Sequence, residues 1–152
     1  MQMKDGGGGI VTIDGHSLRI QDVVRVARQG ASVALSDSAR ARMSKSRAVV
    51  DGVLARGDVV YGVNTGFGKL SDRTVPPEKL RELQLNLVRS HAAGVGPPLP
   101  ESEVRAMMLL RANVLARGHS GVRPEVAELL VAMLNAGLYP PVPEQGSVGA
   151  SG

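Results

Sequence analysis

The chain has 152 residues, a formal net charge of +4 and a hydrophobic content of 43%, enough for a domain with a buried core. No apolar run reaches the roughly 18 residues of a membrane span, and no secretory signal pattern opens the sequence. The absence of cysteine and the separation of three histidines exclude disulfides and make a metal site unexpected. Aromatic residues make up only 2%, too few for nucleic-acid stacking. We expect a cytoplasmic protein with no membrane, nucleic-acid or metal partner.

The N-terminal residues predict a flexible lead-in followed by a short hairpin. Residues 1–9 end in four glycines and are assigned as a flexible N-terminus. Apolar residues flank Asp14 and Gly15, a dipeptide that is frequent in tight turns. This pattern predicts a short β-hairpin over residues 10–20.

The remainder of the chain is expected to be almost entirely helical. Apolar residues recur at the helical spacing of about 3.6, and serine or proline precedes these segments while glycine follows most of them. Helices are therefore predicted over residues 21–30, 36–57, 76–91, 101–117 and 124–137. The fold class is mainly α.

The helix predicted over residues 101–117 is apolar on more than half of its circumference, which indicates burial against several neighbours. Few elements remain in the chain to cover it. The chain therefore looks like part of something larger.

A glycine-rich loop over residues 61–69 is the first segment that could carry chemistry. A phosphate-binding loop would need glycine where Phe67 stands and serine or threonine where Leu70 stands. A dinucleotide-binding loop would need glycine in place of Ser71. The local residues alone therefore favour a tight turn with Tyr61 as a packing residue.

Four motifs in register give this loop a second interpretation. In chain order they are Tyr61-Gly-Val-Asn-Thr-Gly-Phe-Gly, Leu87-Val-Arg-Ser-His-Ala-Ala-Gly, Gly118-His-Ser-Gly-Val-Arg-Pro and Gly146-Ser-Val-Gly-Ala-Ser-Gly. Together they closely resemble the aromatic amino acid ammonia-lyases and aminomutases, and the histidine ammonia-lyases most of all. The resemblance is strong over residues 58–152 and general before them. It implies an elongated helical-bundle enzyme that assembles as a homotetramer. It also implies that residues 10–152 are the N-terminal segment of a larger domain, completed by its own C-terminal remainder.

The resemblance assigns the last three residues to a cofactor. In this family an Ala-Ser-Gly tripeptide cyclises autocatalytically into 4-methylidene-imidazol-5-one (MIO), here from Ala150, Ser151 and Gly152. Glycine leaves the attacking nitrogen unhindered, and serine supplies the hydroxyl that is lost as water. The resulting electrophile offers covalent catalysis to the substrate amine that ordinary side chains do not.

The resemblance also implies roles for residues upstream. Tyr61 is expected to be the base that removes a proton from the substrate β-carbon, on a loop that acts as a lid. A tyrosine base needs nearby positive charge or a helix N-terminus, because free phenols are protonated at neutral pH. His91 is expected to bind the substrate side chain and Gly68 to line the pocket, although a histidine here can equally cap a helix. Asn64 is expected to brace the loop, and His119 to be structural.

The leading interpretation is a carbon–nitrogen lyase of histidine catabolism that converts L-histidine, its small-molecule substrate, into urocanate and ammonia. Two alternatives stay open: a tyrosine ammonia-lyase or tyrosine 2,3-aminomutase, and a non-catalytic helical interaction module. The 152-residue chain is expected to be inactive alone, since pocket residues of the family lie beyond it. Arg105 and Arg123 are expected to be surface or interface charges.

Overall fold

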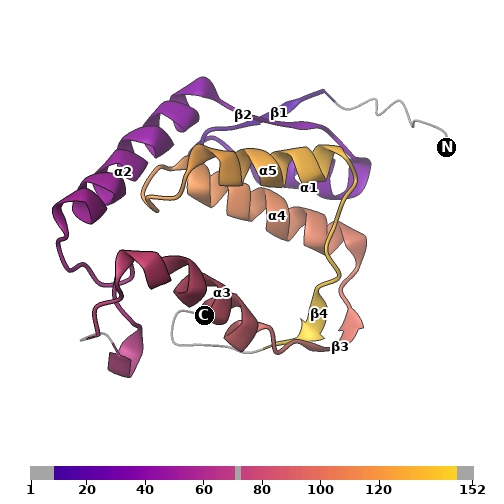
Figure 1. The fold of residues 1–152 in the computed structure, drawn as a ribbon. Helices are drawn as coiled ribbons and strands as arrows, with labels where there is room; N and C mark the ends of the chain where they lie inside the picture. The colour runs from indigo at the N-terminus through magenta and orange to yellow at the C-terminus, as the bar shows by residue number, and fades with distance from the viewer. Residues whose placement is uncertain (1–8, 71–72, 147–152) are drawn as a thin grey trace. The chain divides into compact units, whose positions relative to one another are not determined.

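The computed structural model describes residues 9–70 and 73–146, so most of the expected flexible N-terminus and the whole cofactor tripeptide lie outside the described residues. The elements in chain order are β1 (Val11–Ile13), α1 (Ile20–Gln29), β2 (Val33–Leu35), α2 (Asp37–Arg56), η1 (Gly68–Leu70), η2 (Pro77–Lys79), α3 (Leu80–His91), β3 (Val95–Pro98), α4 (Glu101–Ala116), α5 (Pro124–Asn135) and β4 (Pro143–Gln145) (Figure 1). The mainly α prediction is confirmed. None of the helices described has the length and apolar character to cross a membrane.

The chain divides into two compact units. Unit 1 comprises Met1–Ala48 and Pro98–Val142, and unit 2 comprises Val49–Pro97 and Pro143–Gly152. The long helix α2 begins in unit 1, and its last turns belong to unit 2.

The strands of unit 1 correct the hairpin prediction. β1 pairs with β2 in parallel, in register from Val11 opposite Val33 to Ile13 opposite Leu35. Parallel strands need a crossover connection, and α1 provides it. The predicted antiparallel hairpin over residues 10–20 was therefore wrong.

The reason lies in the hydrogen bonds after β1. The Asp14 carboxylate accepts the backbone N–H groups of His16 and Ser17, each at 2.8 Å. The Gly15 N–H donates to Asn113 Oδ1 on α4 at 3.0 Å. The carboxylate and α4 thus direct the chain into a local side-chain turn that leads to α1 rather than back along β1.

The helix ends of unit 1 follow the predicted signals. Gly30 adopts a left-handed φ of 71° at the end of α1, where glycine is the usual residue. The Ser36 hydroxyl accepts the Ala39 N–H at 3.1 Å and caps the start of α2. Both predicted caps are confirmed.

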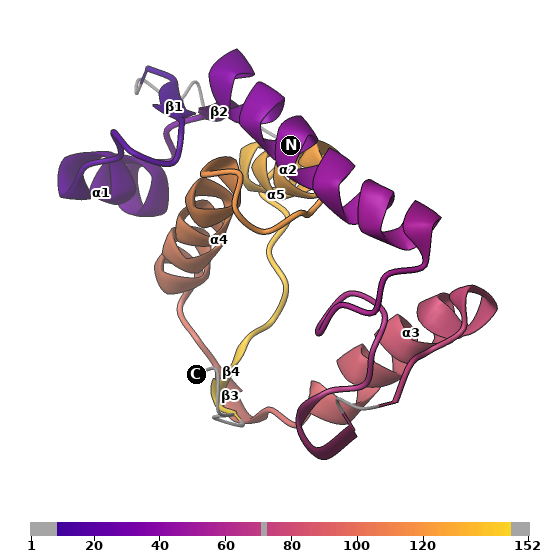
Figure 2. The same ribbon diagram turned by 90° about the vertical axis from the view of Figure 1, so that its left-hand side faces the viewer.

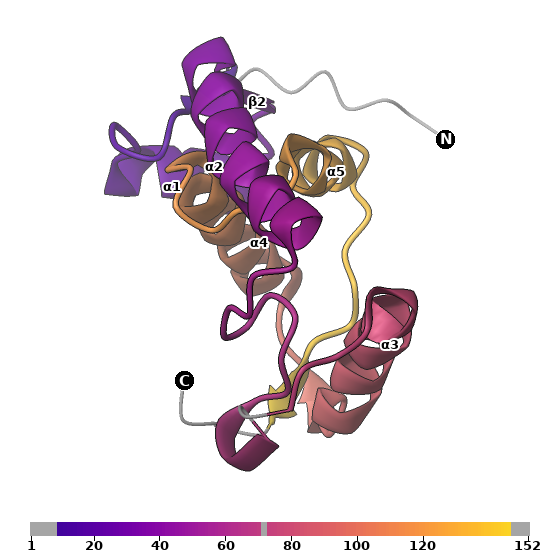
Figure 3. The same ribbon diagram turned by 60° about the vertical axis from the view of Figure 1, so that its left-hand side comes forward.

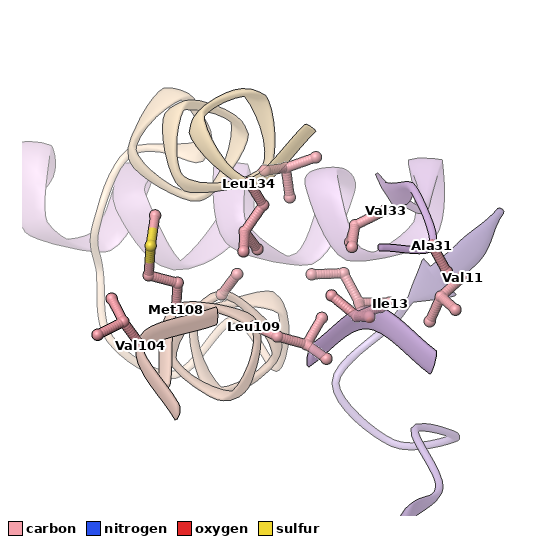
Figure 4. Close-up of a cluster of buried hydrophobic side chains, with 11 residues drawn as sticks. Val11, Ile13, Ala31, Val33, Val104, Met108, Leu109 and Leu134 are labelled. Carbon is pink, nitrogen blue, oxygen red and sulfur yellow. The ribbon is translucent and has the colours of Figure 1, made fainter. Parts of the chain in front are cut away.

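The core of unit 1 forms where α4 packs against α1 and α5, as Figures 1 and 3 show. Side chains from both strands and all three helices meet there (Figure 4). They are Val11, Ile13, Val26, Ala31, Val33, Val104, Met108, Leu109, Ala112, Val131 and Leu134. Leu109 is fully buried, which stabilises the fold by about 2 kcal/mol relative to an exposed leucine.

Another face of α4 stays exposed in this chain. Met107, Leu110 and Val114 retain 49%, 47% and 51% of their surface. They border an apolar groove of about 490 Å³, which Pro140 and Val142 also line. The expectation that α4 is buried on more than half of its circumference is therefore met only in part within this chain.

Arg105 is buried, which corrects its assignment as a surface charge. Only 7% of its surface is exposed, and Nε donates to the Val26 carbonyl oxygen at 2.8 Å. Nη1 donates to the Tyr139 hydroxyl, and the guanidinium lies 5.0 Å from the centre of that ring. Its long side chain crosses the α4–α1 contact and joins the two helices to the segment after α5. Arg123 is exposed as expected.

Two polar side chains tie distant parts of unit 1 together. Asn135, at the end of α5, accepts the Val33 N–H through Oδ1 and donates to the Val33 carbonyl through Nδ2, each at 2.8 Å. The Arg42 guanidinium donates to the carbonyl oxygens of Asp14 and Ala116. These bonds connect α5 to the outer edge of β2, and α2 to the end of α4.

Unit 2 contains the loop after α2, the helix α3 and the pair β3–β4. Figure 2 shows the helix α3 of this unit, and η2 leads directly into it. Pro77 starts η2, so the predicted start of a helix at Pro76-Pro77 begins as a 3-10 turn. The β3 and β4 strands, in proline-rich segments that lack alternating side chains, were not predicted.

Candidate functional site

Tyr61 lies on the exposed tip of the loop between α2 and η2. Its side chain is 62% exposed, and its phenol oxygen accepts the Gly68 N–H at 3.3 Å. Its ring meets that of Phe67 edge-on, with the centroids 6.0 Å apart and the planes at 69°. The structure thus brings together Tyr61 and Gly68, two of the expected pocket residues. Within the described residues the ring packs against the loop itself, so both interpretations of Tyr61, packing residue and base, stay predictions.

The prediction that Asn64 braces this loop is confirmed. Its side chain is largely buried at 8% exposure. Oδ1 accepts the Val60 N–H at 3.0 Å, and Nδ2 donates to the Asp58 carbonyl oxygen at 2.9 Å. The amide therefore satisfies two backbone groups of the segment that enters Tyr61.

Thr65 is a second bracing residue, and the sequence analysis did not identify it. It is 2% exposed, and its hydroxyl accepts the Gly62 N–H at 3.3 Å and donates to the Gly66 carbonyl at 2.8 Å. An isolated β-bridge pairs Thr65 with Thr74 across the loop. A threonine between asparagine and glycine is a signal for such a side-chain-to-backbone turn.

Beneath the loop lies a hollow of about 230 Å³ within unit 2. Its lining is mostly apolar, and the residues are Leu54, Gly57, Asn64, Thr74, Val75, Pro76, Pro77 and Leu80. The volume is below the roughly 300 Å³ at which ligand pockets begin. The hollow therefore marks where the loop rests on α2 and α3, and nothing in it calls for a ligand.

His91 is the last residue of α3 and is exposed. Its Nδ1 lies 2.8 Å from the Leu87 carbonyl oxygen, to which the Ser90 hydroxyl also donates at 2.9 Å. A carbonyl oxygen only accepts, so this contact is a hydrogen bond in the tautomer that carries a proton on Nδ1, and that tautomer leaves Nε2 as an acceptor. His91 therefore caps its helix, as one interpretation held. The other predicted role, substrate contact through the remaining nitrogen, stays a prediction.

The segment that precedes the tripeptide expected to form the cofactor belongs to the same unit as this loop. β4 pairs with β3, and Pro143 packs so closely on Gly94 that a Cβ added there would lie 2.8 Å from Pro143 Cγ. Tyr61, Gly68, His91 and residues 143–146 all fall in unit 2. Ala150, Ser151 and Gly152 themselves lie outside the described residues.

No group of three or more histidine, aspartate or glutamate side chains gathers as metal ligands within residues 9–70 and 73–146. His119 is exposed, and its structural role stays a prediction.

Comparison with known proteins agrees with the four motifs. The family model "Aromatic amino acid lyase" matches residues 18–152, and the chain belongs to this family. It is 54% identical to a histidine ammonia-lyase of Caldanaerobacter subterraneus subsp. tengcongensis over 93% of its own length. The chain spans only 28% of that relative's length.

Solved structures give the same picture of the fold. A histidine ammonia-lyase of Trypanosoma cruzi matches 93% of this chain, and this chain covers 27% of it, with a TM-score of 0.83 and 44% identity. A tyrosine aminomutase of Streptomyces globisporus matches 90% of this chain, with 26% of its own length covered, a TM-score of 0.86 and 44% identity. The fold is thus that of an N-terminal part of these enzymes.

Proposed function

We propose that this chain is the N-terminal part of a histidine ammonia-lyase, a carbon–nitrogen lyase that converts L-histidine into urocanate and ammonia in histidine catabolism. The observation that carries the proposal is the 54% identity to a histidine ammonia-lyase over 93% of the chain. The exposed Tyr61 loop and the helix end at His91, both in unit 2, provide groups that suit this chemistry.

Ala150, Ser151 and Gly152 have the chemistry from which MIO forms, and MIO would supply an electrophile for the substrate amine without a metal. Tyr61 would remove the proton from the substrate β-carbon, and Gly68, which already contacts the phenol, would line the pocket. His91 would accept a hydrogen bond from the substrate imidazole through Nε2, because its Nδ1 proton is engaged by Leu87.

Activity would require the rest of the polypeptide. The chain spans 28% of the relative's length, and the apolar groove on α4 is a surface that its own C-terminal remainder would cover. On this proposal the enzyme is a cytoplasmic homotetramer with an amino acid as its small-molecule substrate and with no nucleic-acid or membrane partner. The chain alone would be inactive.

The second candidate is a tyrosine 2,3-aminomutase or tyrosine ammonia-lyase. The structural similarity to a tyrosine aminomutase, with a TM-score of 0.86, favours it specifically. A phenol side chain would donate to His91 Nε2 as readily as an imidazole N–H does. The two candidates thus differ in substrate while sharing Tyr61 and the tripeptide.

The test uses this chain alone and the same chain extended to the relatives' length, each assayed with histidine and with tyrosine. We expect urocanate from the extended chain, none from the short one, and a mass deficit of two water molecules where the tripeptide has cyclised. Tyr61→Phe should lower turnover by at least about 100-fold, while the matched control Tyr139→Phe, outside the loop, should retain it. Cinnamate-type or β-amino acid products from tyrosine would favour the second candidate. An uncyclised, inactive extended chain would indicate an interaction module.

A further inference from the structure

Asn64 occupies a distinctive place in the loop, because its side chain acts on the chain before Tyr61 while its backbone acts on the chain after it. The side-chain amide joins the Val60 N–H and the Asp58 carbonyl. The backbone carbonyl accepts the Val75 N–H at 2.9 Å. One residue thus links the incoming and outgoing arms of the loop.

The turn that presents Tyr61 is closed by the same residues. The Val63 and Asn64 N–H groups donate to the Val60 carbonyl at 3.1 and 3.3 Å. The two peptide groups that flank Val60 are therefore both held: the preceding one bonds through its N–H to the Asn64 amide, and the following one bonds through its carbonyl to the turn. Tyr61 follows directly, so the direction in which its side chain leaves the loop depends on the backbone at Val60.

The Tyr61 side chain contacts the later part of the same loop. The Tyr61 oxygen reaches the Gly68 N–H, and its ring meets Phe67. Gly66, two residues before Gly68, is fixed to the outgoing arm by its N–H bond to the Arg73 carbonyl at 2.9 Å. The distance between the incoming and outgoing arms of the loop therefore determines whether the Tyr61 phenol oxygen reaches the Gly68 N–H. Asn64 is bonded to both arms.

We propose that Asn64 is the positioning residue of Tyr61: its buried amide fixes the backbone from Asp58 to Val60 and thereby places the phenol oxygen against the Gly68 N–H. The catalytic meaning of this placement rests on the proposed function of Tyr61 as a base. The placement itself is a property of residues 58–68 and 73–75 and is measurable without turnover.

The chain has no tryptophan and two tyrosines, so fluorotyrosine labelling gives two fluorine NMR resonances, which Tyr61→Phe and Tyr139→Phe assign. In Asn64→Ala we expect the Tyr61 resonance to move by at least half of the way to its position in the urea-unfolded chain. The Tyr139 resonance should stay in place. Asn64→Asp keeps the acceptor for Val60 but cannot donate to Asp58, so a smaller shift in the same direction is expected.

Asn135→Ala is the matched control. Asn135 also uses its amide to bond one backbone N–H and one carbonyl, but in unit 1. It should lower thermal stability to a similar extent and leave the Tyr61 resonance where it was. An unmoved Tyr61 resonance in folded Asn64→Ala or Asn64→Asp, or an equal shift in Asn135→Ala, would overturn the proposal. A catalytically dispensable Tyr61 would instead appear in the turnover of Tyr61→Phe, so the two failures are separable.

Discussion

Replacement of Arg105 by alanine should destabilise unit 1 far more than a surface substitution does. The change leaves the Val26 carbonyl without its partner in the α1–α4 contact, and loss of a hydrogen bond to a charged group costs about 1.5–3 kcal/mol. The stacking over Tyr139 adds about 0.5–2 kcal/mol when the pair is desolvated. The sum is about 3 kcal/mol, a large part of the roughly 5–15 kcal/mol that stabilises a typical domain.

Urea unfolding followed by circular dichroism measures this difference, with the exposed Arg123→Ala as the control that should change stability by no more than about 0.5 kcal/mol. A double-mutant cycle with Tyr139→Phe, which keeps the ring and removes the hydroxyl, should give a coupling of about 1 kcal/mol. If Arg105→Ala behaves like Arg123→Ala, the buried bonds do not stabilise the fold and the reasoning is refuted.

Three further predictions concern single positions in unit 1. Ser36→Ala should lower stability by about 1 kcal/mol because the Ala39 N–H loses its cap, and a thermal melt would show no change if another group replaces the hydroxyl. Gly118→Ala should destabilise more than Gly30→Ala: both glycines have a left-handed φ, 77° and 71°, but only at 118 would the new Cβ lie 2.8 Å from Arg42 Cβ, and equal melting temperatures would contradict this. The bonds from the Ser17 and His16 N–H groups lower the pKa of Asp14 to about 2. Its stabilising effect is then present above about pH 4 and lost as the pH falls through about 2. The stability difference between the parent and Asp14→Ala should shrink over that range, and a constant difference would exclude the carboxylate as its source.

The helices could be predicted from the sequence because their signals are local. Apolar spacing and caps such as Ser36 and Gly30 act within a turn or two of the helix they define. The β1–β2 pairing could not be predicted in the same way. Short apolar runs around a turn dipeptide have the same sequence pattern in an antiparallel hairpin and in a parallel pair joined by a crossover. The residue that accepts the Gly15 N–H, Asn113, lies 98 residues away in the sequence.

The residues of the Tyr61 loop could be named from the sequence, but their geometry could not. The motif named Tyr61, Gly68 and the brace Asn64. The hydroxyl bonds of Thr65 to Gly62 and Gly66 are local and carry a signal in the sequence, whereas its bridge to Thr74 is not revealed by the spacing. The surface assignment of Arg105 was wrong for a related reason. Its charge suggested the surface, and only the tertiary contact with Val26 and Tyr139 explains how it is buried.

The bond pair from Asn135 to Val33 has a consequence for how this chain behaves in solution. A two-stranded sheet has open edges, and an open edge is a template on which strands of other molecules can assemble. By imitating the hydrogen bonds of a neighbouring strand, the Asn135 amide occupies the donor and acceptor of Val33 on the outer side of β2. A single side chain thus blocks a growth point for intermolecular β-sheet, without the addition of a third strand.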